Sequence, residues 1–129
     1  MAASGMRSPL GRALGLGSAK RGVEHWWAQR VTAVALIPLS LWFVAALLQQ
    51  MGGDLTGVQH WLGRPVPAIL MVLFLITTFY HAALGLEVVI EDYVHTELVK
   101  LGLVLFVRFA AVALAVAGIF AVLRMAFKT

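Results

Sequence analysis

His81 and Tyr93 carry the side chains whose types and spacing most directly suggest chemistry in this chain. His81 lies inside the uncharged run 67–86, which is long enough to cross a bilayer as a helix. A histidine in hydrocarbon is costly and needs a partner, and a metal centre is one kind of partner. A polar cluster follows where this run should meet water, namely Glu91, Asp92, Tyr93 and His95. On one continuous helix His81 and Tyr93 would be about 18 Å apart, so the sequence predicts two separate sites.

His81 has two interpretations from the residues alone. In one, its imidazole bonds to a backbone carbonyl or to a threonine of a neighbouring helix. In the other, a neutral imidazole nitrogen is an axial ligand of a haem iron, and Gly85, one turn further on, leaves room for a flat ligand. Zinc is disfavoured because no Cys, His or carboxylate stands three or four residues after His81. One chain offers one ligand here, so bis-histidine ligation needs a second subunit.

The cluster around Tyr93 also has two interpretations. Acidic residues commonly end a helix at a water-facing loop, which would give Asp92 and Tyr93 no chemical role. Alternatively, Tyr93 donates a hydrogen bond to a quinone carbonyl while neighbouring acids relay protons. Reduction of a quinone takes two electrons and two protons, and the quinone head group prefers the membrane interface.

Two arginines adjoin the predicted spans. Arg108 interrupts the apolar run 101–123, where it either snorkels or pairs with Glu87, or neutralises a buried anion such as a haem propionate. Arg30 stands at the start of the first apolar run, where it can snorkel to the interface.

These side chains would be positioned by membrane-spanning helices. Of the 129 residues, 61% are hydrophobic and only 12% are charged, which is too apolar for a soluble domain. The apolar residues form three blocks of about the 20 residues that a spanning helix requires. We therefore predict an all-α integral membrane protein with three transmembrane helices, at about 30–50, 67–90 and 101–124. Pro38 predicts a kink in the first of them, near Leu36.

The distribution of positive charge predicts the orientation. Five basic residues precede the first span, namely Arg7, Arg12, Lys20, Arg21 and Arg30. Short loops rich in Lys and Arg stay on the cytoplasmic side, so we predict the N-terminus inside and the C-terminus outside. Residues 87–100 would then lie on the inner side. Residues 1–22 are interpreted as a flexible cytoplasmic tail, with a cleaved transit sequence as the alternative.

The chain has no cysteine, which excludes disulfides, thiolate catalysis and iron–sulfur ligation by its own residues. Three helices form a thin bundle, and polar groups at membrane depth predict that another subunit covers its faces. We expect the lipid bilayer as a partner and no nucleic acid.

Two passages resemble a known family. The first is Glu24-His25-Trp26-Trp27-Ala28-Gln29-Arg30-Val31-Thr32-Ala33, which leads into the proline-containing helix. The second is His81-Ala82-Ala83-Leu84-Gly85-Leu86 with Glu91-Asp92-Tyr93-Val94-His95. Together they resemble the hydrophobic membrane anchor, the smaller cytochrome b subunit, of succinate dehydrogenase. The preceding run 15–20 is similar to that of bacterial, particularly alphaproteobacterial, members. The resemblance extends from about residue 10 to the end.

The resemblance implies roles that spacing alone does not. The histidine matching His81 is an axial ligand of haem b, shared with a histidine of the larger, cytochrome b556-type anchor subunit. The residues matching Tyr93 and Asp92 contact or adjoin ubiquinone near the iron–sulfur subunit, and Arg30 matches an arginine near haem and quinone. Arg108 is outside the motif. Flavin and iron–sulfur clusters would belong to the flavoprotein and iron–sulfur subunits, and the location would be the bacterial inner membrane.

The predicted function is therefore that of a non-dehydrogenase anchor subunit in respiratory complex II, which passes electrons from succinate oxidation in the tricarboxylic acid cycle to quinone. One alternative is a haem-free structural anchor of a related fumarate reductase-type complex. The other is a small ion-conducting membrane protein with Arg108 and Glu87 along its path.

Overall fold

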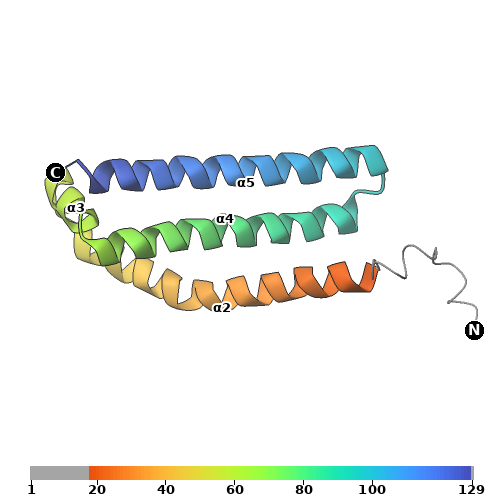
Figure 1. The fold of residues 1–129 in the computed structure, drawn as a ribbon, viewed down its shortest axis with the longest axis horizontal. Helices are drawn as coiled ribbons and strands as arrows, with labels where there is room; N and C mark the ends of the chain where they lie inside the picture. Colours follow the sequence, from red (N-terminus) through yellow and green to blue (C-terminus); the bar gives the residue numbers. More distant parts are fainter. Residues whose placement is uncertain (1–17, 129) are drawn as a thin grey trace, which may run out of the picture.

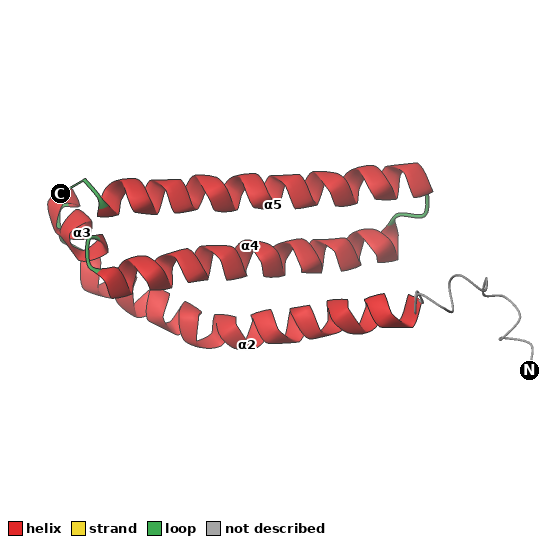
Figure 2. Ribbon diagram, in the orientation of Figure 1, coloured by secondary structure: helices red, strands yellow, loops and turns green. Residues whose placement is uncertain are grey.

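A computed structural model of the chain describes residues 18–128, and every regular element in that part is a helix (Figure 2). The elements are α2 (Ser18–Gln50), α3 (Leu55–Leu62), α4 (Pro65–Tyr93) and α5 (Glu97–Ala126). Three of them, α2, α4 and α5, are long and apolar enough to cross a membrane. The predicted all-α class with three spanning helices is confirmed. Most of the predicted tail, at 1–17, lies outside the described residues.

The three long helices lie side by side in one layer (Figure 1). The central helix, α4, packs against both α2 and α5, while α3 crosses one end of the layer and contacts α4 and α5. The first residues of α2 and the turn 94–96 lie at the same end, and 51–64 lies at the other (Figure 1). This alternation is what three consecutive spans require, and which end faces the cytoplasm stays a prediction.

The helices begin earlier and end later than the apolar runs that predicted them. Helix α2 is already helical at Ser18, well before Arg30, although the apolar part suited to a membrane is Gly22–Gln50. Helix α4 continues to Tyr93, so the acidic cluster forms its last turn, while His95 lies in the turn that follows. Hydropathy marks the part of a helix in hydrocarbon, whereas the backbone hydrogen bonds continue through the polar turns at either side.

Helix α3 was not predicted from the sequence. The Asp54 side chain caps it, because its Oδ1 accepts a hydrogen bond of 2.9 Å from the backbone N–H of Gly57. At 8 residues it is too short to appear as an apolar run. Its Trp61 ring stacks on Trp42 of α2, with centroids 6.0 Å apart, so this helix closes one end of the layer.

The predicted kink in the first spanning helix has a counterpart in the shape of α2, which bends along its length (Figure 1). Pro38 lies inside this helix and has no N–H to donate to the turn before it. Beyond the bend, Phe43 stacks on Phe74 of α4 with centroids 4.6 Å apart. The bend therefore accompanies close contact between α2 and α4 at this level.

A layer one helix thick has little interior. Among the described residues the buried apolar side chains are few, namely Ala46, Leu62, Ala83, Leu84 and Ala126. Two polar side chains are nevertheless buried, Thr32 at 9% and Glu87 at 5% exposure. Large apolar side chains cover the outer faces of the spans, which suits lipid or another subunit rather than water.

Helices α4 and α5 approach closely at Gly118. A Cβ placed on this glycine would lie 3.2 Å from the Leu75 Cδ1 atom. We therefore expect Gly118→Leu to force the two helices apart and to lower the free energy of unfolding by about 1–3 kcal/mol, as overpacking typically does. The measurement is the thermal unfolding midpoint of the detergent-solubilised protein.

The matched control is Gly102→Leu on the same helix, because a Cβ there would meet no atom of the chain within 4 Å. Equal destabilisation by both variants would contradict the packing argument, since a helix-wide effect of replacing glycine would then explain the loss.

Candidate functional site

His81 is held on the central helix, about 24 Å of rise from the start of α4 at Pro65. Its Nδ1 atom lies 2.9 Å from the Oγ1 atom of Thr32 on α2. A threonine of a neighbouring helix is thus the partner of His81, as the first interpretation of its role expected. This contact occupies one ring nitrogen, and imidazole has two, so Nε2 stays available to another partner.

The surface next to His81 is open. A Cβ placed on Gly85, one turn further along α4, would have no atom of this chain within 4 Å. Within the described part of the chain, no hydrogen bond engages His81 Nε2. The backbone at Gly85 is therefore open to contact from a group outside this chain.

The donor set fits haem iron. Among the described residues, no three His, Cys, Asp or Glu side chains gather into a group that could hold a metal ion. A haem brings four nitrogen ligands of its own, so one imidazole from this chain and one ligand from another suffice. The single His81 donor beside an open glycine is compatible with that arrangement.

Arg30 lies near the depth of His81, but it is on a different side of α2 from Thr32, the residue that contacts His81. The contacts Thr32–His81 and His25–Glu87 show that α2 and α4 run antiparallel, and that the two residues of each pair lie at the same depth. Arg30 is two residues from Thr32, which corresponds to about 3 Å of rise and about 200° of rotation. Its guanidinium lies 5.4 Å from the centroid of the Trp26 ring. The chain itself therefore does not bring Arg30 to His81.

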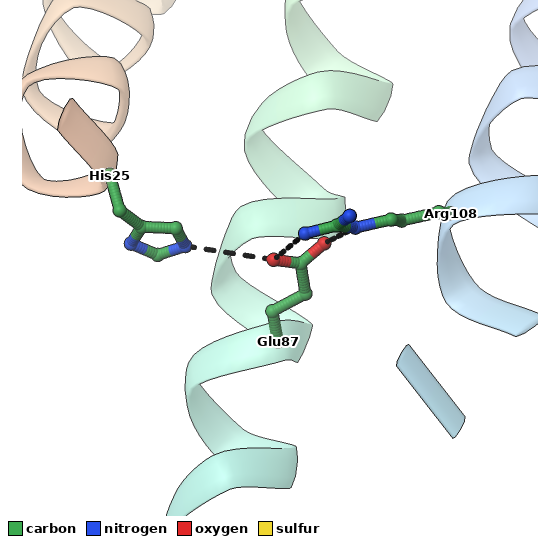
Figure 3. A network of polar contacts seen from close by, with 3 residues as sticks. All are labelled: His25, Glu87 and Arg108. Atoms are coloured by element: carbon green, nitrogen blue, oxygen red, sulfur yellow. Dashed lines mark hydrogen bonds and ion pairs between the residues drawn. The ribbon is translucent and has the colours of Figure 1, made fainter. Parts of the chain in front are cut away.

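Glu87 joins all three long helices (Figure 3). Arg108 of α5 donates to it twice, from Nε to Oε1 at 2.6 Å and from a terminal nitrogen to Oε2 at 3.2 Å. His25 of α2 approaches from the other side, with Nε2 at 3.8 Å from Oε2. Only 7% of the Glu87 side chain is exposed, against 61% for Arg108. The carboxylate is thus the buried centre, and pairing with Glu87 is the role of Arg108 that the structure contains.

The Glu87 cluster, defined as His25, Glu87 and Arg108, opens on a groove of about 1100 Å³ that all three long helices line. His81 is not among its lining residues. Glu87 follows His81 by six positions on the helix, so their side chains leave α4 on faces about 120° apart. The structure therefore keeps Arg108 away from His81 and gives the two polar sites different faces.

Asp92 and Tyr93 lie in the last turn of α4, and both are exposed. Asp92 is eleven residues beyond His81, about three turns and 16 Å, so it lies on nearly the same face. Tyr93 is rotated by about a further 100°, and this residue is 78% exposed in the chain. The two predicted quinone residues share the helix end, while their side chains diverge.

Sequence reasoning identified neither Thr32 nor His25 as a partner of these sites. Thr32 stands inside the first of the two passages that carried the family resemblance, and this was the one available signal. His25 stands beside two tryptophans, a setting typical of the membrane interface, so its sequence context gives no sign of a carboxylate partner. Neither contact can be predicted from one sequence, because the rotation of α2 against α4 decides which side chains meet.

Comparison with known proteins gives a consistent result. The family model for the succinate dehydrogenase/fumarate reductase transmembrane subunit matches residues 4–123. The succinate dehydrogenase hydrophobic membrane anchor subunit of Rickettsia bellii is 37% identical over 116 residues, covering 90% of this chain and 93% of that protein. The corresponding subunit of Paracoccus denitrificans is 34% identical over 118 residues, covering 92% and 91%. No solved structure matches the chain significantly.

Fold and site define an integral membrane protein with three spanning helices and a histidine inside one of them. More particularly, the chain belongs to the family of succinate dehydrogenase/fumarate reductase transmembrane subunits. Its relatives are hydrophobic membrane anchor subunits rather than the dehydrogenase subunit that oxidises the substrate. The two polar sites on α4 thus belong to an anchor and not to a self-contained enzyme.

The Glu87 cluster generates a prediction about stability. Arg108→Leu leaves the buried Glu87 carboxylate without its strongest partner, which costs about 3–5 kcal/mol for a buried pair. Because much of the Arg108 side chain is exposed, we expect the lower end of that range. The double variant Glu87→Gln with Arg108→Leu should recover most of the loss, since no charge is then stranded. The measurement is again the thermal midpoint in detergent, and additive losses in the double variant would show that the pair is not coupled.

Proposed function

We propose that this chain is the smaller membrane anchor of a succinate:quinone oxidoreductase in a bacterial inner membrane. In this function it assembles with a larger cytochrome b-type anchor, an iron–sulfur subunit and a flavoprotein. The single observation that supports the proposal most is His81 on a spanning helix, with an open glycine beside it, in a chain of this family. The relatives are named succinate dehydrogenase anchors, and this chain aligns with almost their whole length.

His81 would hold haem b through Nε2, and the larger anchor subunit would supply a second ligand to the iron. When bound, the haem would supply one-electron redox chemistry. The chain contributes a fixed imidazole and an apolar surrounding, both of which influence a haem potential. Arg30 is near the depth of His81, but it lies on a different face of α2 from Thr32. Contact between Arg30 and a haem propionate would therefore depend on how the larger subunit positions the haem.

Tyr93 and Asp92 would line the ubiquinone site at the inner end of α4. The Tyr93 hydroxyl donates a hydrogen bond to a quinone oxygen and stabilises negative charge as it develops during reduction. Asp92 stands next to it and passes protons from the aqueous side. Their exposure in the isolated chain leaves both side chains available to a quinone and to the iron–sulfur subunit.

The direct bonds between Glu87 and Arg108 disfavour the ion-conducting alternative, since each group is neutralised by the other. The family match disfavours it independently. The haem-free anchor remains the rival that experiment must separate from the proposed function.

His81→Ala tests the haem assignment. We expect the purified complex to lose its reduced-haem absorption, because the variant removes an iron ligand. The four subunits should still assemble, because the substitution changes the stability of the helix little. His60→Ala is the matched control and should keep the spectrum, because His60 lies on α3, before the start of α4 and well away from His81. An unchanged spectrum in His81→Ala would reject the haem function of this chain.

Tyr93→Phe tests the quinone assignment. We expect succinate–ubiquinone activity to fall by about 10²-fold, the usual effect of removing one donor to a developing oxyanion. Succinate oxidation with an artificial acceptor should stay intact, because that electron path bypasses the quinone. Tyr80→Phe is the control, since the chain has 2 tyrosines and Tyr80 lines the groove of the Glu87 cluster. Equal loss of both activities in Tyr93→Phe would indicate failed assembly instead.

A further inference from the structure

Thr32 makes an unusual set of contacts for one hydroxyl group. Its Oγ1 lies 2.7 Å from the Ala28 carbonyl oxygen, 3.1 Å from the Gln29 carbonyl oxygen and 2.9 Å from His81 Nδ1. The residue is buried between α2 and α4, with 9% of its surface exposed. Its hydrogen-bonding state is therefore set by these neighbours rather than by water.

Counting protons assigns the direction of each bond. A threonine hydroxyl carries one hydrogen, and the two backbone carbonyls can only accept. If that hydrogen pointed at His81, the oxygens of Thr32 and Ala28 would face each other at 2.7 Å with no hydrogen between them. The favourable arrangement has Thr32 donating to its own helix and accepting from His81. Nδ1 must then carry the imidazole proton, which leaves the lone pair on Nε2.

We propose that Thr32 is a positioning residue for the haem ligand: it fixes the Nδ1–H tautomer of His81, holds the ring plane, and so presents Nε2 to the iron. This inference rests on the proposed haem function of His81. A partner that accepts from the second nitrogen of a metal-bound histidine also makes the metal-bound nitrogen more basic. A more basic ligand favours ferric over ferrous haem, so the Thr32 contact should lower the haem reduction potential.

The contact also makes ligand orientation depend on how two helices pack. Thr32 belongs to α2 and His81 to α4, so the ring keeps its orientation only while these helices stay in register. The His25–Glu87 contact joins the same pair of helices nearer the end of the layer at which α2 begins. Two contacts at different depths, Thr32–His81 and His25–Glu87, therefore maintain the alignment of α2 with α4 on which the position of His81 Nε2 depends.

Thr32→Val in the purified complex is the decisive variant, because valine keeps the shape of threonine and cannot accept the bond. We expect haem dissociation about 10-fold faster, at the lower limit of the usual effect of losing such a partner. A tenfold shift in the preference for ferric over ferrous haem would raise the midpoint potential by about 59 mV. Thr32→Ser keeps the hydroxyl and should stay close to the parent in both measurements.

Thr78→Val is the matched control within the spans, since the buried Oγ1 of Thr78 has no hydrogen-bond partner among the described residues. Both measurements are made per assembled complex, by redox titration of the haem spectrum and by transfer of haem to an excess acceptor protein. A lower yield of Thr32→Val therefore does not affect the result.

The possible outcomes distinguish the positioning role of Thr32 from the haem ligation by His81 on which it rests. If His81→Ala loses haem while Thr32→Val keeps the parent potential and haem retention, the positioning role is wrong and the ligand assignment stands. If His81→Ala keeps its haem, both fail. The positioning role is also overturned if Thr32→Ser behaves like Thr32→Val, or if Thr78→Val causes the same shifts, because packing or a general loss of a hydroxyl would then explain them.

Discussion

The need to pair ionisable side chains inside hydrocarbon governs this protein. Helix α4 carries two such groups, His81 and Glu87, and each reaches a different combination of neighbours. His81 meets Thr32 of α2, while Glu87 meets Arg108 of α5 and also approaches His25 of α2. Since the layer has few buried apolar side chains, these polar contacts are among the features that define how its helices are rotated and aligned.

The same constraint separates the two halves of the site. Because His81 and Glu87 leave α4 on different faces, the surface around His81 is free of the Glu87 cluster and open at Gly85. Tyr93 and Asp92 are further along the same helix, beyond the apolar run and exposed. One rigid helix thus sets the distance between the proposed haem ligand and the proposed quinone residues.

A hydrogen bond that appears purely structural can serve a chemical purpose. A buried histidine with a threonine partner is satisfied at one nitrogen, and this would explain its presence without any cofactor. The direction of that bond matters more than its existence, because a hydroxyl already committed to a backbone carbonyl can only accept from the ring. The structural interpretation of His81 and its proposed role as a haem ligand are therefore compatible.

The sequence by itself determined the all-α class, the three spans and the positions of His81, Asp92 and Tyr93 along one of them, because hydropathy and helical rise are local properties of the chain. It also placed Arg108 at membrane depth and left open whether Glu87 or a haem propionate was its partner. It did not predict α3, whose 8 residues depend on the Asp54 cap and on contacts with α4 and α5. Tertiary structure alone decided that Thr32 faces His81 and that Arg108 faces Glu87, since a small rotation of α2 or α5 would bring other side chains to α4.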